Sequence, residues 1–278
     1  MRKSTTASAL LGAALLLSGC ADSSLTRSGL LSSYDGQKRS DGMLTHASFR
    51  VDKPRMLAAK TVAIMPASFA DSAQVAGFSP EQRRLVSNSI DRSLCAGLSE
   101  RFRIVPSPRE ADLVVQAHVT AVAPTNVTMA GISSAASIGG SVAGAATGLP
   151  ISVPRIPIGL GSLAVEAEAM AQGSQQAALI WARGADSMTT RPRASNEADA
   201  YALASEFGAD FARLLVTGDD PIKLSLSVPS ARGVGEFLGA SPKEAACARY
   251  GRNPGVGGLV GGMVGLPPNW TDSGAARP

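Results

Sequence analysis

Glu166 and Glu168 stand two residues apart in a stretch where apolar and polar residues alternate. This alternation predicts a half-buried strand over residues 163–171. In a strand, residues two apart share a face, and their side chains lie about 7 Å from each other. Two such carboxylates could perform acid–base chemistry or hold a cation. We favour a simpler interpretation, in which they form a solvated outer face balanced by Arg183 on the following strand.

The remaining polar residues form no known catalytic or metal-binding motif. His46 and His118 are the only histidines, and neither has a His, Cys or Glu at ligand spacing. The sequence contains no Gly-x-Ser-x-Gly turn and no glycine-rich phosphate loop. We therefore expect no enzymatic activity, no catalytic residue and no metal. A hydrolase with an unrecognised set of residues is the remaining enzymatic hypothesis, and no motif supports it.

Cys20 ends a pattern that resembles the lipobox of bacterial lipoproteins. A basic start at residues 1–3 precedes an apolar core at residues 7–17. That core is shorter than the roughly 20 residues that a membrane-spanning helix needs. The pattern predicts a signal peptide at residues 1–19 and acyl chains such as palmitate on the Cys20 thiol, with no other cofactor. Ala21 follows in place of Asp, which favours the outer membrane over the inner membrane.

Cys95 and Cys247 are the two cysteines left after lipidation of Cys20. In the oxidising periplasm they could form a disulfide. One buried and one exposed thiol fits the sequence equally well, so the pairing stays open at this point. Their separation is far too long for a metal motif.

Two stretches repeat glycine at every fourth position. On a helix these glycines would align and allow close contact between helices, as in membrane proteins. Prolines bound both stretches, and glycine costs about 1 kcal/mol per position in a helix. We therefore favour flexible loops and keep self-association or membrane insertion as the alternative. The glycines are Gly140, Gly144 and Gly148 in the first stretch, and Gly257, Gly261 and Gly265 in the second.

The composition excludes several classes of protein. The 278 residues are 45% hydrophobic and 17% charged, with a mean hydropathy of +0.11. These values exclude a polytopic membrane protein and a fully disordered chain. The net charge is +4, and it falls to +2 once Arg2 and Lys3 leave with the signal peptide. Without a cluster of basic and aromatic residues, we expect no nucleic-acid partner.

Hydrophobic periodicity predicts an α/β (α+β) fold, a two-layer sandwich. A strand–helix–strand unit comes first, antiparallel strands follow, and a helix closes the domain. The first helix is marked by a capping box at Ser79 and Gln82. The expected strands are 61–66, 102–106, 112–122, 163–171 and 177–183, and the helices are 80–100 and 195–218.

These elements predict four regions in the chain. The signal peptide at 1–19 precedes a lipidated tether at 20–59. A periplasmic domain at 60–217 carries a Gly/Ala-rich insertion at 123–162. Residues 218–278 are expected to form a low-complexity tail.

The tether contains Ser28-Gly29-Leu30-Leu31-Ser32-Ser33-Tyr34, a compact apolar patch that we expect to dock on the domain. Together with the lipobox it resembles the opening "SGFLxxY" of a bacterial lipoprotein family catalogued as domain of unknown function 3313. The strands at 62–66 and 101–105, the strand at 165–168 and the closing helix follow in that family's order. The resemblance covers roughly residues 20–217. It implies a fold similar to periplasmic lipoprotein domains, and it implies no activity and no catalytic residues.

We therefore expect an outer-membrane-anchored, periplasm-facing lipoprotein. It would serve as a non-enzymatic binding or envelope-assembly module, attached to the membrane by its lipid and in contact with another envelope protein. The alternative is a membrane-inserting or self-associating oligomer that uses the repeated glycines. The sequence does not determine the partner or the oligomeric state.

Overall fold

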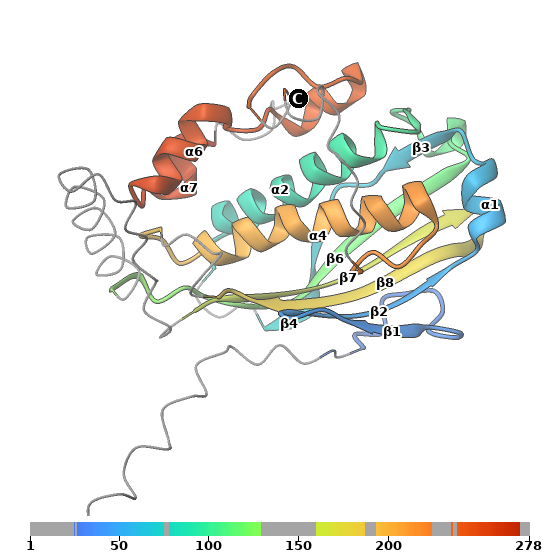
Figure 1. Cartoon of the computed structure of the whole chain (residues 1–278), viewed down its shortest axis with the longest axis horizontal. Helices are drawn as coiled ribbons and strands as arrows, with labels where there is room; N and C mark the ends of the chain where they lie inside the picture. The colour runs from blue at the N-terminus through green and yellow to red at the C-terminus, as the bar shows by residue number, and fades with distance from the viewer. Residues whose placement is uncertain are drawn as a thin grey trace, which may run out of the picture.

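The structure, a computed structural model, describes residues 25, 27–74, 78–128, 160–186, 193–223, 235 and 238–272. One mixed sheet of eight strands forms one layer, and two long helices cover one of its faces (Figure 1). The expected α+β sandwich is thus confirmed. The strands are β1 (Lys38–Asp41), β2 (Thr45–Val51), β3 (Thr61–Ile64), β4 (Ser68–Gln74), β5 (Arg103–Ile104), β6 (Leu113–Ala123), β7 (Ser162–Ala171) and β8 (Ser174–Gly184).

The strand order is β1-β2-β8-β7-β6-β3-β5, and β4 also pairs with β6. The pairs from β1 to β6 along this order are antiparallel, whereas β3 and β4 run parallel to β6. The register places Gln116 opposite Glu168 and His118 opposite Glu166. These four side chains share the sheet face that the long helices do not cover, which we call the open face.

The helices α2 (Pro80–Leu98) and α4 (Ala198–Thr217) pack side by side on the other face (Figure 1). The expected capping box starts α2, with Gln82 N donating to Ser79 Oγ at 3.2 Å and Ser79 N donating to Gln82 Oε1 at 2.8 Å. A Cβ atom on Gly97 would lie 2.5 Å from the Ala212 side chain. Glycine at this position therefore lets the two helices approach closely.

The core lies between this helix pair and the sheet. Trp181 of β8 is fully buried and meets Phe207 of α4 edge to face, with ring centroids 5.7 Å apart. The Trp181 indole N–H donates to Asp210 at 3.0 Å. Because a buried N–H without a partner is costly, this bond allows a tryptophan in the core.

Residues 38–58 correct the prediction of a tether at 20–59. They form β1, β2 and the short helix α1 (Lys53–Ala58), and β2 pairs with β8 along its length. The sequence signal is weak because β2 buries only small or isolated apolar side chains, such as Ala47 and Phe49. The domain therefore includes part of the predicted tether.

The predicted low-complexity tail also contains ordered structure. It holds the 3-10 helix η2 (Ala245–Tyr250) and the helices α6 (Gly255–Met263) and α7 (Pro268–Thr271). In Figure 1 these red elements lie on the outer side of α2 and α4, away from the sheet. We refer to residues 238–272 as the C-terminal tail.

The Gly/Ala-rich insertion at 123–162 lies largely outside the described residues, but both of its ends are fixed. Thr125 N donates to the Asn196 carbonyl at 2.8 Å, and Gly161 N donates to the Asp199 carboxylate at 2.8 Å. Asp199 is fully buried at the start of α4. The two ends therefore attach to the same helix start.

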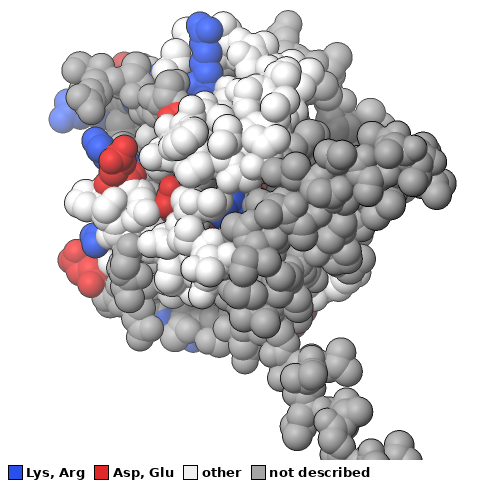
Figure 2. Space-filling model, turned by 90° about the vertical axis from the view of Figure 1, so that its left-hand side faces the viewer, with Lys and Arg blue, Asp and Glu red and all other residues white. Residues whose placement is uncertain are grey.

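The described helices include none that is both long enough and apolar enough to span a membrane. On the end of the molecule shown in Figure 2, isolated basic and acidic side chains are scattered over a largely uncharged described surface.

Candidate functional site: two carboxylates on the open sheet face

Glu166 and Glu168 project from β7 on the open face, but solvent does not reach them. Their exposed fractions are 0% and 2%. The expectation of a solvated face balanced by Arg183 is therefore wrong. Arg183 instead forms ion pairs with Glu206 of α4 at 2.6 Å and with Asp186 at 3.8 Å.

The segment Arg27–Tyr34, which we call the strap, covers the two carboxylates. Glu166 accepts three hydrogen bonds from it. Ser28 donates from its backbone N at 2.7 Å and from its Oγ at 2.6 Å, and the Tyr34 hydroxyl donates at 2.6 Å. The prediction that this segment docks on the domain is confirmed.

Glu168 is bound in the same way four residues further along the strap. Ser32 donates to it from its backbone N at 2.9 Å and from its Oγ at 2.7 Å. The amides of Gln116 on β6 and Gln175 on β8 donate at 2.6 and 2.8 Å. The four-residue step from Ser28 to Ser32 on the strap thus spans the two-residue step from Glu166 to Glu168 on the strand.

An apolar contact supports these hydrogen bonds. Leu31, between the two bonded serines, is 6% exposed and packs on Ala178 and Ile180 of β8. Gly29 adopts a positive φ of 86°, a conformation that favours glycine. Its N–H donates to the Tyr34 oxygen at 2.7 Å, which closes the strap into a compact turn.

The pKa shifts of Glu168 and Tyr34 are consistent with these hydrogen bonds. Burial alone would raise the pKa of Glu168, but the hydrogen bonds from Gln175 and Ser32 outweigh it and lower the pKa below its usual value. Burial and the hydrogen bond to Glu166 raise the pKa of Tyr34. At neutral pH the phenol therefore keeps the proton that it donates, and Glu168 remains an acceptor.

A serine–histidine pair lies beside this site, and sequence reasoning missed it. Ser68 Oγ on β4 lies 2.8 Å from His118 Nδ1 on β6. Such a pair can start nucleophilic catalysis when a third group orients the histidine. Glu166 stands opposite His118 in the register, but its oxygens accept from Ser28 and Tyr34. The carboxylate beside the serine–histidine pair thus binds the strap, and its oxygens already accept hydrogen bonds from it.

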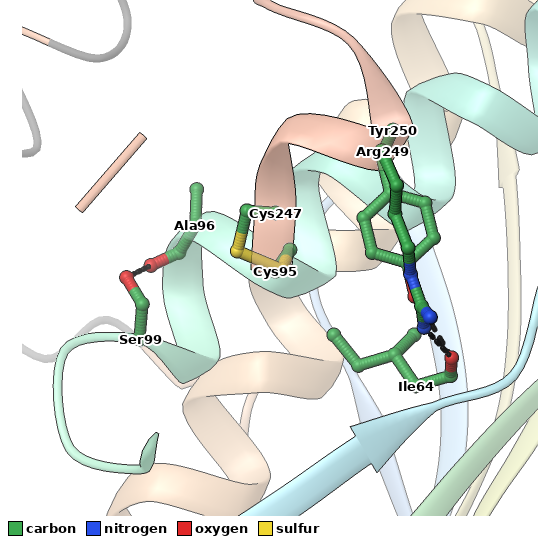
Figure 3. The surroundings of a disulfide bond; sticks show 7 residues. All are labelled: Ile64, Cys95, Ala96, Ser99, Cys247, Arg249 and Tyr250. Atoms are coloured by element: carbon green, nitrogen blue, oxygen red, sulfur yellow. Dashed lines mark hydrogen bonds between the residues drawn. A yellow bond between two sulfur atoms is a disulfide. The ribbon is translucent and has the colours of Figure 1, made fainter. Parts of the chain in front are cut away.

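A second set of long-range bonds holds the C-terminal tail on the helix layer. Cys95 of α2 and Cys247 of η2 form a disulfide, with Cα atoms 5.8 Å apart (Figure 3). One turn earlier on α2, Arg92 forms a buried ion pair with Asp272. The Tyr201 hydroxyl of α4 donates to the same carboxylate at 2.7 Å.

The tail also reaches the end of β3. The Tyr250 hydroxyl and the Arg249 guanidinium each donate to the Ile64 carbonyl at 2.8 Å (Figure 3). Nearby, Asp91 of α2 accepts from Ala67 N at 2.9 Å. Burial raises the pKa of Asp91 to about 7, against the opposing effects of the Ala67 N–H, Arg249 and Arg92.

The repeated glycines of the tail do not form one exposed stripe. The stretch is helical rather than a loop, and a Cβ atom on Gly257 would meet nothing within 4 Å. A Cβ atom on Gly261, in contrast, would lie 2.7 Å from Thr271 of the same chain. Gly265 follows the helix with a positive φ of 76°. The close approach at Gly261 is therefore internal to the tail.

Several predicted residues lie outside the described part of the chain. They are Cys20, Gly140, Gly144 and Gly148. Within the described residues, no group of three or more His, Cys, Asp or Glu side chains could hold a metal ion.

Comparison with known proteins gives one family and several similar solved structures. The family model described as "Protein of unknown function (DUF3313)" matches residues 26–211. No curated protein matches the chain. A PelC dodecamer from Paraburkholderia phytofirmans is 11% identical, with a TM-score of 0.36 over 63% of this chain and 98% of that chain.

A single-residue variant of that PelC dodecamer is also 11% identical, with a TM-score of 0.33 over 63% of this chain and 100% of that chain. Neither TM-score is high enough to carry an argument about function or assembly. The match to the family model includes the strap and both carboxylates, and it ends before the C-terminal tail.

Proposed function

The chain belongs to the DUF3313 family of proteins of unknown function, and we propose that it is a lipoprotein of the bacterial envelope. Acyl chains on Cys20 would anchor it, most simply in the outer membrane, with its domain in the periplasm. The domain would act without catalysis, as a binding module for another envelope protein.

The observation that carries this proposal is the seating of the strap on Glu166 and Glu168. The strap starts only seven residues after Cys20. Five hydrogen bonds from the strap to two buried carboxylates hold it on the sheet. Two more, from Gln116 and Gln175, hold the Glu168 carboxylate in place. Such a set of bonds is expected where the chain beside an anchor must be held against its own domain.

A non-catalytic role is supported by the state of the polar groups on the open face. Glu166 and Glu168 already accept hydrogen bonds from the strap and from neighbouring glutamines. An acid–base catalyst needs a carboxyl group that can exchange a proton with a substrate. Contact with another protein is therefore the simpler function for this domain.

Substitution of Cys20 tests the anchor. We expect Cys20→Ser to remain an uncleaved precursor or to leave the membrane fraction, because a hydroxyl does not replace the thiolate in lipid transfer. Labelling with a palmitate analogue should be lost at the same time. Ser24→Ala, in the same segment, is the matched control and should be labelled and fractionated like the wild type. A fully processed Cys20→Ser protein that stays in membranes would contradict the proposal.

Crosslinking in cells tests the binding role. A photoreactive residue at Trp270, which is 70% exposed on α7, reports contacts of the tail. We expect adducts with a different envelope protein. Adducts that contain only copies of this chain would favour the second candidate function, self-association.

One observation favours that second candidate. Val256, Val260 and Val264 lie four residues apart on one side of α6 and its C-terminal end, and their exposed fractions are 58%, 52% and 45%. An exposed apolar stripe of this kind is typical of a contact surface. Native mass measurement in detergent separates the two functions, because a self-associating chain gives a defined oligomer that Val260→Lys should dissociate.

A further inference from the structure

The strap fixes the chain to the open face of the sheet, on the opposite side of the domain from the C-terminal tail (Figure 1). Glu166 holds Ser28 through two hydrogen bonds, of 2.7 and 2.6 Å. Eight residue steps separate Cys20 from this fixed point. Because an extended chain spans at most about 3.6 Å per residue, these steps reach about 29 Å at most.

If the whole strap detaches when its bonds to Glu166 and Glu168 are lost, the chain is first fixed at Lys38, where β1 begins. Eighteen residue steps separate Cys20 from Lys38. The same chain geometry then allows a reach of about 65 Å. The two carboxylates therefore more than halve the length of chain over which the domain can move relative to Cys20.

On the basis of the lipidation proposed for Cys20, we infer that the carboxylate-bound strap orients the domain on the bilayer that holds its own acyl chains. The open face of the sheet is directed toward the lipid headgroups, and the C-terminal tail is directed away from them. Packed layers lie about 10 Å apart, so the tail stands about 20 Å further from the bilayer than the sheet does. A periplasmic partner would then meet the helix layer and the tail.

The chain offers reporters for both sides of the domain. Trp270 is 70% exposed on the tail and reports the far side. Val114 lies half-buried on β6 between two residues that face the core, so its side chain is on the open face. The double variant Val114→Trp/Trp270→Phe moves the reporter to the near side. Trp181 is present in both proteins and contributes the same background.

Energy transfer from tryptophan to a lipid dye measures the orientation. The mature chain is coupled through Cys20 to a maleimide lipid, since Cys95 and Cys247 are held in their disulfide. The vesicles contain dansyl-labelled phosphatidylethanolamine. We expect at least twofold greater transfer from the double variant than from the wild type. Equal transfer, or greater transfer from the wild type, would overturn the inferred orientation.

Removal of the carboxylates tests whether the strap sets this orientation. Glu166→Ala/Glu168→Ala, introduced into both proteins, should bring the two transfer efficiencies together, because the domain can then rotate on a longer tether. Asp35→Ala is the matched control, since Asp35 directly follows the strap and, among the described residues, its carboxylate accepts from Ser33 and not from either glutamate's partners. A difference that persists in the double-Ala proteins would contradict the role of the strap.

Because the lipid is coupled chemically, the transfer measurement tests the orientation independently of the lipidation proposed for the native protein. The mass of the native protein extracted from membranes reports whether Cys20 carries acyl chains. A free Cys20 thiol in that protein would refute the proposed anchor, whereas the transfer measurement on the coupled chain would still report the orientation that the strap imposes.

Discussion

The strap and the C-terminal tail are two peripheral segments that attach to opposite faces of the same domain by different chemistry. Hydrogen bonds to Glu166 and Glu168 hold the strap on the open face. A disulfide and a buried ion pair hold the tail on the helix layer. The strap is inside the region that the family model matches, and the tail is beyond it.

The two kinds of attachment respond to different conditions. Hydrogen bonds to carboxylates depend on pH and can break and re-form, whereas a disulfide persists until it is reduced. The strap therefore responds to acid, and the tail responds to reductant and to the loss of its ion pair. Each of the following predictions affects one segment and should spare the other.

The largest effect is expected for the ion pair under the tail. Arg92→Ala leaves Asp272 buried without its cation, and removal of one partner of a buried pair typically costs about 3–5 kcal/mol. Urea denaturation should show this loss in the free energy of unfolding. Arg84→Ala, at an exposed position of the same helix, should cost less than about 0.5 kcal/mol. Equal losses in the two variants would show that the ion pair does not secure the tail.

Loss of the disulfide should have the next largest effect. Cys95 and Cys247 are 152 residues apart, and a crosslink over so long a loop restricts the unfolded chain strongly. We expect Cys95→Ser/Cys247→Ser to lose about 2–5 kcal/mol of unfolding free energy. Dithiothreitol should lower the wild type to the same value and leave the double variant unchanged. A further loss in the double variant would point to an effect of the reductant elsewhere.

A smaller effect is expected for the strap. Glu166→Ala removes the acceptor of three hydrogen bonds. Leaving buried donors without a partner typically lowers the free energy of unfolding by about 1–3 kcal/mol. Trypsin should then cut after Arg27 faster than in the wild type, while the tail stays protected. Asp35→Ala should leave the cleavage rate unchanged. If the tail were cut faster as well, the two segments would not be independent.

Changes of pH should act with opposite signs in the two regions. Glu168 has a lowered pKa when folded, so its contribution to stability is present above pH 4.5, its ordinary pKa, and is lost as the pH falls through the lowered value. Asp91 has a pKa raised from 3.8 to about 7, so its contribution is largest below pH 4 and declines as the pH rises to about 7.

Amide hydrogen exchange between pH 3 and pH 8 would resolve these two signs. The strap should exchange faster toward the acid end. The α2 residues around Asp91 should exchange more slowly there after correction for intrinsic rates. Asp91→Asn should abolish the second trend only.

The sequence by itself determined the features that rest on neighbouring residues. The capping box of α2 joins Ser79 to Gln82, three positions away, and alternation over 112–122 follows from the geometry of a single strand. The strap motif is likewise contiguous, and so is the pattern that resembles a lipobox. The sequence also indicated which face of β7 carries Glu166 and Glu168, because the period of a strand fixes that face.

Only the tertiary structure decided what covers that face and what the tail contacts. Ser28 meets Glu166 across 138 residues, and Arg92 meets Asp272 across 180. Alternation assigns a residue to a face but does not tell whether water or another segment lies against it. The partner of a side chain so far along the chain is selected by packing of the whole domain, and no local pattern encodes it.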